Sequence, residues 1–185
     1  MRKEIRILGI DDSPFERNSK NVLVIATFFR GGNFLDGVLS TYVRKDGLNS
    51  TKKIAGMVNR SKFKSQIRAL LLDGIAVAGF NVIDIVKLNK LTKIPVIVVM
   101  RNYPDKAKMF NALRKIKQEN KIKLIEKAGR IHKIGKTHIQ MAGISLEDAK
   151  EIIKIATTNS EIPECIRIAH LIASGIIKGE SKGQA

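Results

Sequence analysis

The chain has 185 residues, with 34 Lys and Arg against 17 Asp and Glu, so its formal net charge at pH 7 is +17. Its 44% hydrophobic content excludes wholesale disorder, and no apolar run approaches the ~18 residues that a bilayer span needs. A single cysteine, Cys165, excludes an intrachain disulfide framework. We therefore expect a cytoplasmic protein with one domain over residues 1–178 and a disordered tail at 179–185.

The excess of basic residues predicts a polyanionic partner, most often nucleic acid, and not a membrane. A lysine-rich surface adapted to heat is the alternative, but such surfaces usually raise Glu together with Lys. Here basic residues outnumber acidic ones two to one. They concentrate in residues 44–64 and 106–136, which we interpret as tracks for nucleic-acid phosphates. The pattern says nothing of the oligomeric state.

The first part of the chain has the pattern of three strands joined by short turns. Residues 5–10 are short and β-branched, residues 22–29 are continuously apolar, and residues 35–43 can return after the turn at Arg30–Asn33. Connections this short predict an antiparallel meander.

Helices and strands then alternate. The predicted helices are one capped by Asn49 or Ser50 and running through Val58, one around 82–91, one after Pro104, one capped by Ser145 and ending near 157, and one over about 163–177. The predicted strands are 67–72, 95–100, 122–125, 130–134 and 138–141. This order predicts one mixed α/β sheet with helices on both faces, in the ribonuclease-H-like arrangement. A doubly wound nucleotide-binding fold would alternate from the start.

Carboxylates follow two of the predicted buried strands. Asp11 and Asp12 end the first strand, and Asp73 ends the strand at 67–72. Ligands of open α/β sheets are usually held at strand ends, and oxygen ligands suit Mg²⁺ or Mn²⁺. The alternative is that these aspartates only form turns. On a basic protein, two such sites together favour a metal that assists phosphodiester cleavage.

The segment Ala78–Asn81 follows the second of these strands. Phe80 can stack on an extruded base, and Asn81 can hydrogen-bond to the edge of a base. The alternative is that Phe80 belongs to the core and Asn81 caps the next helix, a position that Asn prefers.

Several segments, taken in order, resemble a mainly archaeal family related to endonuclease V. They are Gly9–Asp12, Arg30–Gly32, Leu35–Val38, Leu72–Ile75, Gly79–Val82 and Pro95–Arg101. Near the C-terminus, Ile162–His170 resembles the Pro-Glu-Pro-x-Arg-x-Ala-Asp stretch of endonuclease V. The resemblance implies a ribonuclease-H-like fold and Mg²⁺-dependent cleavage of DNA near a deaminated base, deoxyuridine before hypoxanthine, in DNA repair.

The same resemblance assigns residues. Asp11 and Asp73 match the metal aspartates, Arg101 stands where endonuclease V has a functional Lys, and His170 stands where the last helix supplies an acidic residue. Two departures are clear. The catalytic Glu falls near Lys53, which cannot bind a metal, and the strand-separating wedge is replaced by residues 43–47.

Taken together, the candidate residues fall into three overlapping sets. The catalytic candidates are Asp11, Asp73, Asp12, Asp46 and Arg101, where Asp12 or Asp46 would replace the missing Glu. The metal-binding candidates are Asp11, Asp73 and His170. The nucleic-acid candidates are Arg30, Arg44, Lys45, Phe80, Asn81 and Arg101, with DNA favoured over RNA.

Two other functions stay open at this point. The missing Glu is also compatible with a nucleic-acid-binding protein that has lost catalysis. A phosphate-ester enzyme acting on a small anionic metabolite would show turnover on nucleotides and little salt-dependent affinity for DNA.

Overall fold

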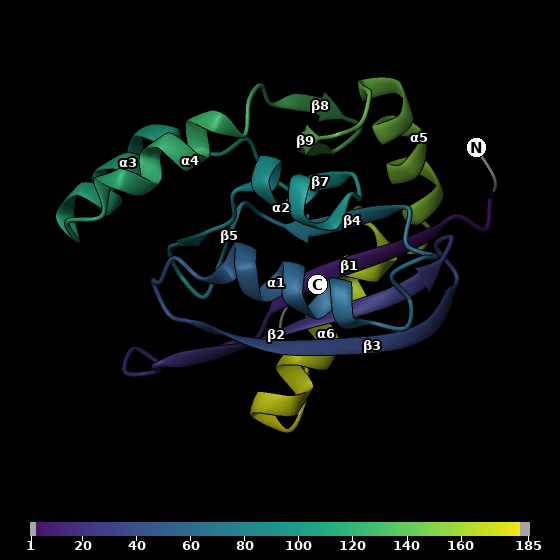
Figure 1. The fold of residues 1–185 in the computed structure, drawn as a ribbon, viewed down its shortest axis with the longest axis horizontal. Coiled ribbons are helices and arrows are strands. Elements are labelled where there is room, and N and C mark those ends of the chain that lie inside the picture. Colours follow the sequence, from purple (N-terminus) through teal and green to yellow (C-terminus); the bar gives the residue numbers. More distant parts are fainter. Residues whose placement is uncertain (1–2, 182–185) are drawn as a thin grey trace.

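A computed structural model describes residues 3–181, and these form a seven-stranded mixed sheet in the order β3-β2-β1-β4-β7-β9-β8 (Figure 1). The predicted tail at 179–185 lies largely outside the described residues, because residues 182–185 are not among them. In the described part of the chain, no helix combines the length and the apolar character that crossing a membrane requires.

The N-terminal strands form the predicted meander. β1 (Arg6–Asp12) pairs antiparallel with β2 (Asn21–Arg30), and β2 pairs antiparallel with β3 (Phe34–Arg44). β2 is buried on both faces, as its unbroken apolar run indicates, whereas β3 is the exposed edge of the sheet. Gly31 makes the turn between them with a φ of +60°, which glycine adopts without steric cost.

Two parallel strands continue the sheet from β1. β4 (Ala69–Asp73) pairs parallel with β1, and β7 (Val96–Met100) pairs parallel with β4. The carboxyl ends of β1, β4 and β7 therefore meet at one end of the sheet. β9 (Thr137–Ala142) and β8 (His132–Ile134) close the far edge as an antiparallel hairpin.

Helices cover both faces of the sheet, as predicted. α1 (Ser50–Arg60) and α2 (Ile85–Thr92) bury Ile54, Val58 and Leu88 against one face. α5 (Leu146–Ala156) and α6 (Glu164–Lys178) pack on the other, where Ile152 and Ile166 lie in a second hydrophobic cluster. A short hairpin, β5 (Ala76–Val77) and β6 (Asn81–Val82), stands apart from the main sheet.

The segment between β7 and β8 corrects one prediction. Residues 122–125 were predicted as a strand, but α4 (Ile122–Lys127) is a helix, preceded by α3 (Lys106–Lys115) and a 3₁₀ turn, η1 (Glu119–Lys121). The reason is the spacing of the buried residues Lys121, Ile125 and Ala128, which follow at i, i+4 and i+7 on one helical face. Figure 1 shows α3 and α4 projecting to one side of the sheet.

Candidate active site

Asp11 and Asp73 lie at neighbouring positions of two parallel strands. The register pairs Ile10 of β1 with Leu72 of β4, so the next residue of each strand is an aspartate. Both aspartates therefore project from the same face of the sheet. Asp11 is only 5% exposed. The fold thus brings together the two carboxylates that the sequence singled out.

His170 reaches this pair from α6. Its Nδ1 donates a hydrogen bond to Oδ2 of Asp11 at 2.9 Å. This hydrogen bond, opposed by partial burial and assisted by the charges of Asp11 and Asp73, raises the pKa of His170 above its usual value. The histidine is therefore placed to hold the Asp11 carboxylate in a fixed orientation.

The close approach of α6 depends on a glycine. A Cβ atom at Gly9 would lie 2.3 Å from the carbonyl carbon of Cys165, so only glycine fits at this point of β1. The hydroxyl of Thr27 on β2 also donates a hydrogen bond to the carbonyl oxygen of Cys165. These contacts hold α6 directly over the strand that ends in Asp11.

Arg101 follows β7 and faces Asp73. Its Nη2 lies 4.0 Å from Oδ2 of Asp73, and 41% of its side chain is exposed. Burial and the charge of Asp11 raise the pKa of Asp73 to about 6, although Arg101 and His170 act in the opposite direction. Arg101 therefore lies beside the carboxylates while part of its side chain remains open to solvent.

Asp12 projects from the opposite face to Asp11. Its Oδ2 accepts a hydrogen bond from the backbone N–H of Ala78 at 2.8 Å, which ties the end of β1 to the β5–β6 turn. Burial, followed by the charge of Asp11, raises the pKa of Asp12 to about 7. Asp12 thus lies on the other face of the sheet from Asp11 and is held there by the β5–β6 turn.

Asp46 lies against the same turn. Its Oδ1 accepts a hydrogen bond from the N–H of Phe80 at 2.8 Å, and its own N–H donates to the carbonyl of Ala78 at 2.9 Å. Asp46 and Ala78 have φ values of +50° and +51°, which residues other than glycine seldom adopt. The side chain of Asp46 therefore serves first to hold this turn, and Ala78 links it to Asp12.

Lys121 has a role that its place among the basic residues of 106–136 did not predict. The side chain of Lys121 is 1% exposed, and its Nζ donates to the carbonyl oxygens of Asp46 at 2.7 Å and of Phe80 at 2.6 Å. A third bond goes to the side-chain oxygen of Gln118. Burial lowers the pKa of Lys121, while the charge of Asp46 opposes the shift. The signal available in the sequence was its spacing from Ile125 and Ala128.

Phe80 and Asn81 lie differently in the fold. Phe80 is half-buried and packs against the core beneath α1 and α2. Asn81 is fully buried, and its Oδ1 accepts from the N–H of Ser50 at 3.1 Å, while its Nδ2 donates to the carbonyl of Arg44 and to Asn49. The alternative that Asn81 caps the next helix is wrong, because Asp84 caps α2 and Asn81 accepts a hydrogen bond from the first residue of α1.

The predicted nucleic-acid residues occupy both ends of the sheet. Arg44 ends β3 and Lys45 follows it, at the end of the sheet that carries the carboxylates, and Nζ of Lys45 donates to the carbonyl oxygens of Glu16 and Arg17. Arg30 lies at the opposite end, where β2 pairs it with Arg6 and where it forms an ion pair with Asp36. Arg30 is therefore remote from the carboxylates along the length of β2.

The donor set fits a metal that keeps much of its own hydration. Lys53 is exposed on α1. Within residues 3–181, no three His, Cys, Asp or Glu side chains group closely enough to enclose an ion. Magnesium is commonly bound by only one or two carboxylates, together with water and substrate phosphate. Asp11, which is buried, and Asp73 beside it, which is partly exposed, match that requirement.

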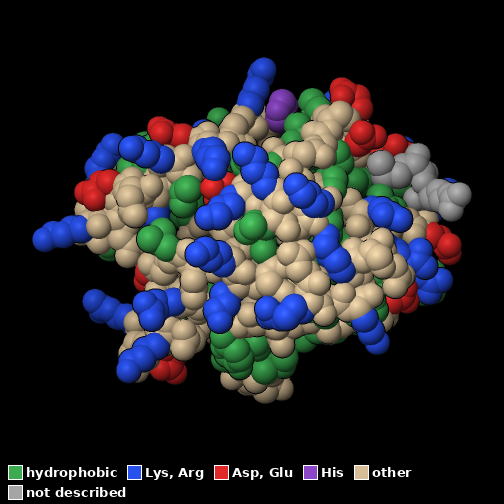
Figure 2. Space-filling model, viewed as in Figure 1, with side chains coloured by type: hydrophobic (Ala, Val, Ile, Leu, Met, Phe, Trp, Pro, Cys, Tyr) green, Lys and Arg blue, Asp and Glu red, His purple; other side chains and the backbone are tan. Residues whose placement is uncertain are grey.

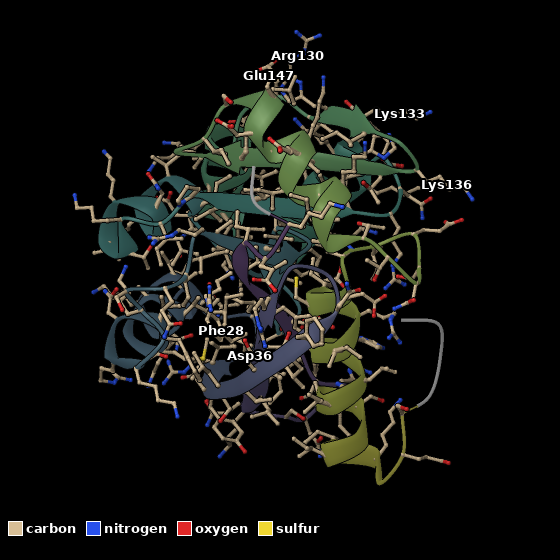
Figure 3. All side chains as sticks on the ribbon, turned by 90° about the vertical axis from the view of Figure 1, so that its right-hand side faces the viewer. Phe28, Asp36, Arg130, Lys133, Lys136 and Glu147 are labelled. Atoms are coloured by element: carbon tan, nitrogen blue, oxygen red, sulfur yellow. The ribbon has the colours of Figure 1, made fainter. Side chains whose placement is uncertain are left out.

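Basic side chains are spread widely over the surface of the protein. Figure 2 shows Lys and Arg side chains spread over the face formed by α1 and α2, with acidic side chains mostly at the margins. Figure 3 shows Arg130, Lys133 and Lys136, from the segment around β8, directed away from the protein. The net charge of +17 is thus displayed on the outside, where it can attract a polyanion.

A family model for endonuclease dU matches residues 3–177. The chain belongs to the endonuclease dU family. The predicted resemblance to an archaeal family related to endonuclease V is thereby confirmed. One relative is a UPF0215 protein from Methanothermobacter thermautotrophicus. It is 50% identical to this chain over 191 residues, and the match covers 100% of this chain and 94% of the relative.

Two solved structures place the endonuclease dU family chain among known folds. An Archaeoglobus fulgidus protein, described as of unknown function, is 42% identical with a TM-score of 0.88, over 94% of this chain and 99% of its own. Ciona intestinalis endonuclease V, solved in complex with a DNA that contains an inosine, is 16% identical with a TM-score of 0.57, over 89% of this chain and 82% of its own. The second likeness shows a shared fold.

Proposed function

We propose that this chain is a metal-dependent endonuclease that cuts DNA near a deaminated base, deoxyuridine before hypoxanthine, in DNA repair. The observation that carries the proposal is the pairing of Asp11 and Asp73 at adjacent strand ends, with His170 bonded to Asp11. Membership of the endonuclease dU family supports the reaction class. The strand order and the likeness to endonuclease V also support a ribonuclease-H-like fold, with residues 1–178 as one domain.

Each residue near the pair has a proposed part in cleavage. Asp11 and Asp73 would hold Mg²⁺ or Mn²⁺, and His170 would orient Asp11. Such an ion, when bound, activates water and stabilises the charge that builds up during phosphodiester cleavage. Asp12, which projects from the opposite face of the sheet, would hold the end of β1 against the β5–β6 turn through its hydrogen bond from the N–H of Ala78. Arg101, partly exposed beside Asp73, would bind the phosphate being cut.

A basic groove beside the site suits the nucleic-acid strand. It has a volume of about 720 Å³, and its lining includes the basic residues Arg44, Lys45, Lys52 and Lys117 together with Asp46, Leu48 and Asn49. These cations would contact phosphates, and neighbouring groups such as Phe80 would recognise the base. Asn81 and Arg30 stay outside this interface, because Asn81 is buried and Arg30 lies at the other end of β2.

The proposal is tested with end-labelled oligonucleotides that carry one deoxyuridine, one hypoxanthine or only normal bases, in Mg²⁺ or in EDTA. We expect a cut at the modified base that needs Mg²⁺ and that Asp11→Asn and Asp73→Asn each reduce by at least about a hundredfold. Asp36→Asn is the matched control, because Asp36 is an exposed aspartate paired with Arg30. It should leave cleavage unchanged.

The same assay distinguishes the nuclease proposal from the alternative that the protein binds nucleic acid without cutting it. The absence of a carboxylate at Lys53 favours that alternative. Salt-sensitive binding of every oligonucleotide, with no cut in either metal and no effect of Asp11→Asn, would establish it and overturn the nuclease proposal. Turnover of small phosphate esters without DNA binding would overturn both.

A further inference from the structure

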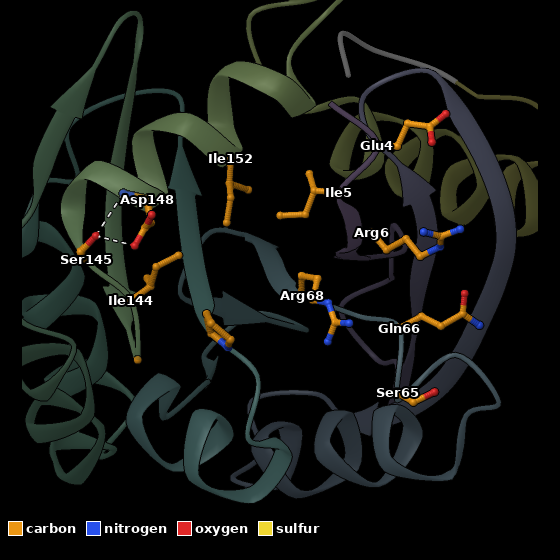
Figure 4. Close-up of a pocket in the computed structure, with 12 residues that line it drawn as sticks. Glu4, Ile5, Arg6, Ser65, Gln66, Arg68, Ile144, Ser145, Asp148 and Ile152 are labelled. Atoms are coloured by element: carbon orange, nitrogen blue, oxygen red, sulfur yellow. Dashed lines mark hydrogen bonds between the residues drawn. The ribbon is translucent and has the colours of Figure 1, made fainter. Parts of the chain in front are cut away.

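A second cavity lies at the end of the sheet that is remote from the aspartates. It has a volume of about 780 Å³ and opens at the amino ends of β1, β4 and β7. Figure 4 shows its two sides: Arg6, Arg68 and Gln66 on one, and Ser145, Asp148 and Ile144 on the other. Its volume is in the range of small-molecule sites, about 300–1,000 Å³.

Two arginines stand next to each other at this cavity. Arg6 and Arg68 directly precede the first paired residues of β1 and β4, and the N–H of Arg68 donates to the carbonyl of Arg6 at 2.8 Å. Neighbouring positions on parallel strands project from the same face, so two like charges lie side by side. Within residues 3–181, no ion pair or side-chain hydrogen bond is formed by either guanidinium, and Nε of Arg6 is buried without an acceptor.

The acidic residues of the cavity do not neutralise this pair. Asp148 accepts a hydrogen bond from the hydroxyl of Ser145 at 2.8 Å, so it is engaged at the start of α5, on the side opposite the arginines (Figure 4). Glu4 is exposed at the rim. Ile5 and Ile152 supply apolar wall between the two sides, and Ile144 adds to it from the side of Ser145. The cavity thus combines donors that lack an acceptor with an apolar surface.

We propose that this cavity binds the phosphate monoester of a nucleotide, a site separate from the carboxylates. Guanidinium groups match phosphate oxygens in pairs of parallel hydrogen bonds, and among the residues that the structure describes these two arginines have no acidic partner that a phosphate would have to displace. The isoleucine wall would take the sugar and base. The phosphate can come from a free mononucleotide or from the phosphorylated end of a strand, and both present the same group to Arg6 and Arg68.

The test follows the Nε–H resonance of Arg6 by NMR in the ¹⁵N-labelled full-length protein. The probes are thymidine 5′-monophosphate, thymidine, and one short oligonucleotide with either a 5′-phosphate or a 5′-hydroxyl. We expect a saturable shift with one or both phosphate-monoester probes and none with thymidine or the 5′-hydroxyl strand. Arg68→Met should weaken that binding at least about tenfold, because it removes charged hydrogen bonds.

Controls make the outcome decisive. Arg68 is exposed, so Arg68→Met and Arg68→Lys should fold, which their unfolding temperature checks. Arg130→Met removes an exposed arginine elsewhere and should leave the affinity unchanged. Asp11→Asn should also leave it unchanged, so the result is independent of nuclease activity. No saturable shift at Arg6 with either phosphate probe, or equal binding by wild type, Arg68→Met and Arg130→Met, would overturn the proposal.

Discussion

At the scale of single residues, the aspartates are held in a state that favours their protonated form. Asp12 and Asp73 have unfolded pKa values near 3.8, and folding raises them to about 7 and about 6, chiefly by burial. A group whose pKa rises on folding binds more protons in the folded state than in the unfolded state. Its contribution to the free energy of unfolding therefore falls as the pH increases. A nearby positive charge would favour the ionised form of these carboxylates. In Asp73, Arg101 and His170 lower the pKa only in part.

This arrangement predicts how stability depends on pH. Without metal, the free energy of unfolding should fall between pH 5 and pH 8, as Asp12 and Asp73 lose their protons. The pKa of His170 is also raised by folding, so loss of its proton lowers the free energy of unfolding as well. Urea unfolding in EDTA across this range measures it. Asp12→Asn should flatten the profile, and a wild-type stability that rises toward pH 8 would contradict the explanation.

At the scale of elements, the position of α6 depends on one missing side chain. Gly9→Ala would place a Cβ 2.3 Å from the backbone of Cys165, so β1 and α6 must separate. We expect a loss of stability of about 1–3 kcal/mol or more, measured by urea unfolding, with a fall in cleavage because His170 moves from Asp11.

The matched control lies on α6 itself. Gly175 has no atom within 4 Å of a built Cβ, so Gly175→Ala should stabilise the helix by about 0.5–1 kcal/mol. Equal effects of the two substitutions would show that the contact at Gly9 is not what positions the helix.

A second element-scale prediction concerns the segment from α3 to α4. Lys121→Met keeps the length of the buried side chain but removes its three hydrogen bonds, so the carbonyls of Asp46 and Phe80 lose their donor. We expect a loss of about 1–3 kcal/mol and faster amide exchange in residues 46–48 and 78–81, measured by hydrogen–deuterium exchange. Lys115→Met, an exposed lysine on α3, should change neither; equal protection in both variants would refute the role of Lys121.

The elements also show what could be predicted from the sequence and what could not. Unbroken apolar runs predicted β2 and β7, because a strand that is buried on both faces is apolar at every position. The aspartates that end β1 and β4 could be predicted because each directly follows such an apolar run. Residues 122–125 were mistaken because a short apolar run fits strand and helix equally. The partners of Asn81 and Lys121 lie 31 and 75 residues away, so no local pattern reports them.

At the scale of the whole molecule, the charge of +17 predicts binding that depends steeply on salt. A protein that makes about 6–10 phosphate contacts loses about 10³–10⁵ in affinity between 50 and 200 mM salt. We expect the affinity for undamaged DNA to fall in this way, measured by fluorescence anisotropy. Lys52→Gln with Lys117→Gln, in the basic groove, should reduce the slope more than Lys133→Gln with Lys136→Gln. Salt-independent binding would argue against phosphate tracks.

The hydrogen bond between His170 and Asp11 joins residues 159 positions apart, and it has a consequence for synthesis on the ribosome. A nascent chain that has emerged only as far as residue 163 already contains both aspartates, but it lacks α6 and leaves the strand at Gly9 uncovered. The carboxylate pair therefore gains its histidine partner only after the last helix has been translated and has docked.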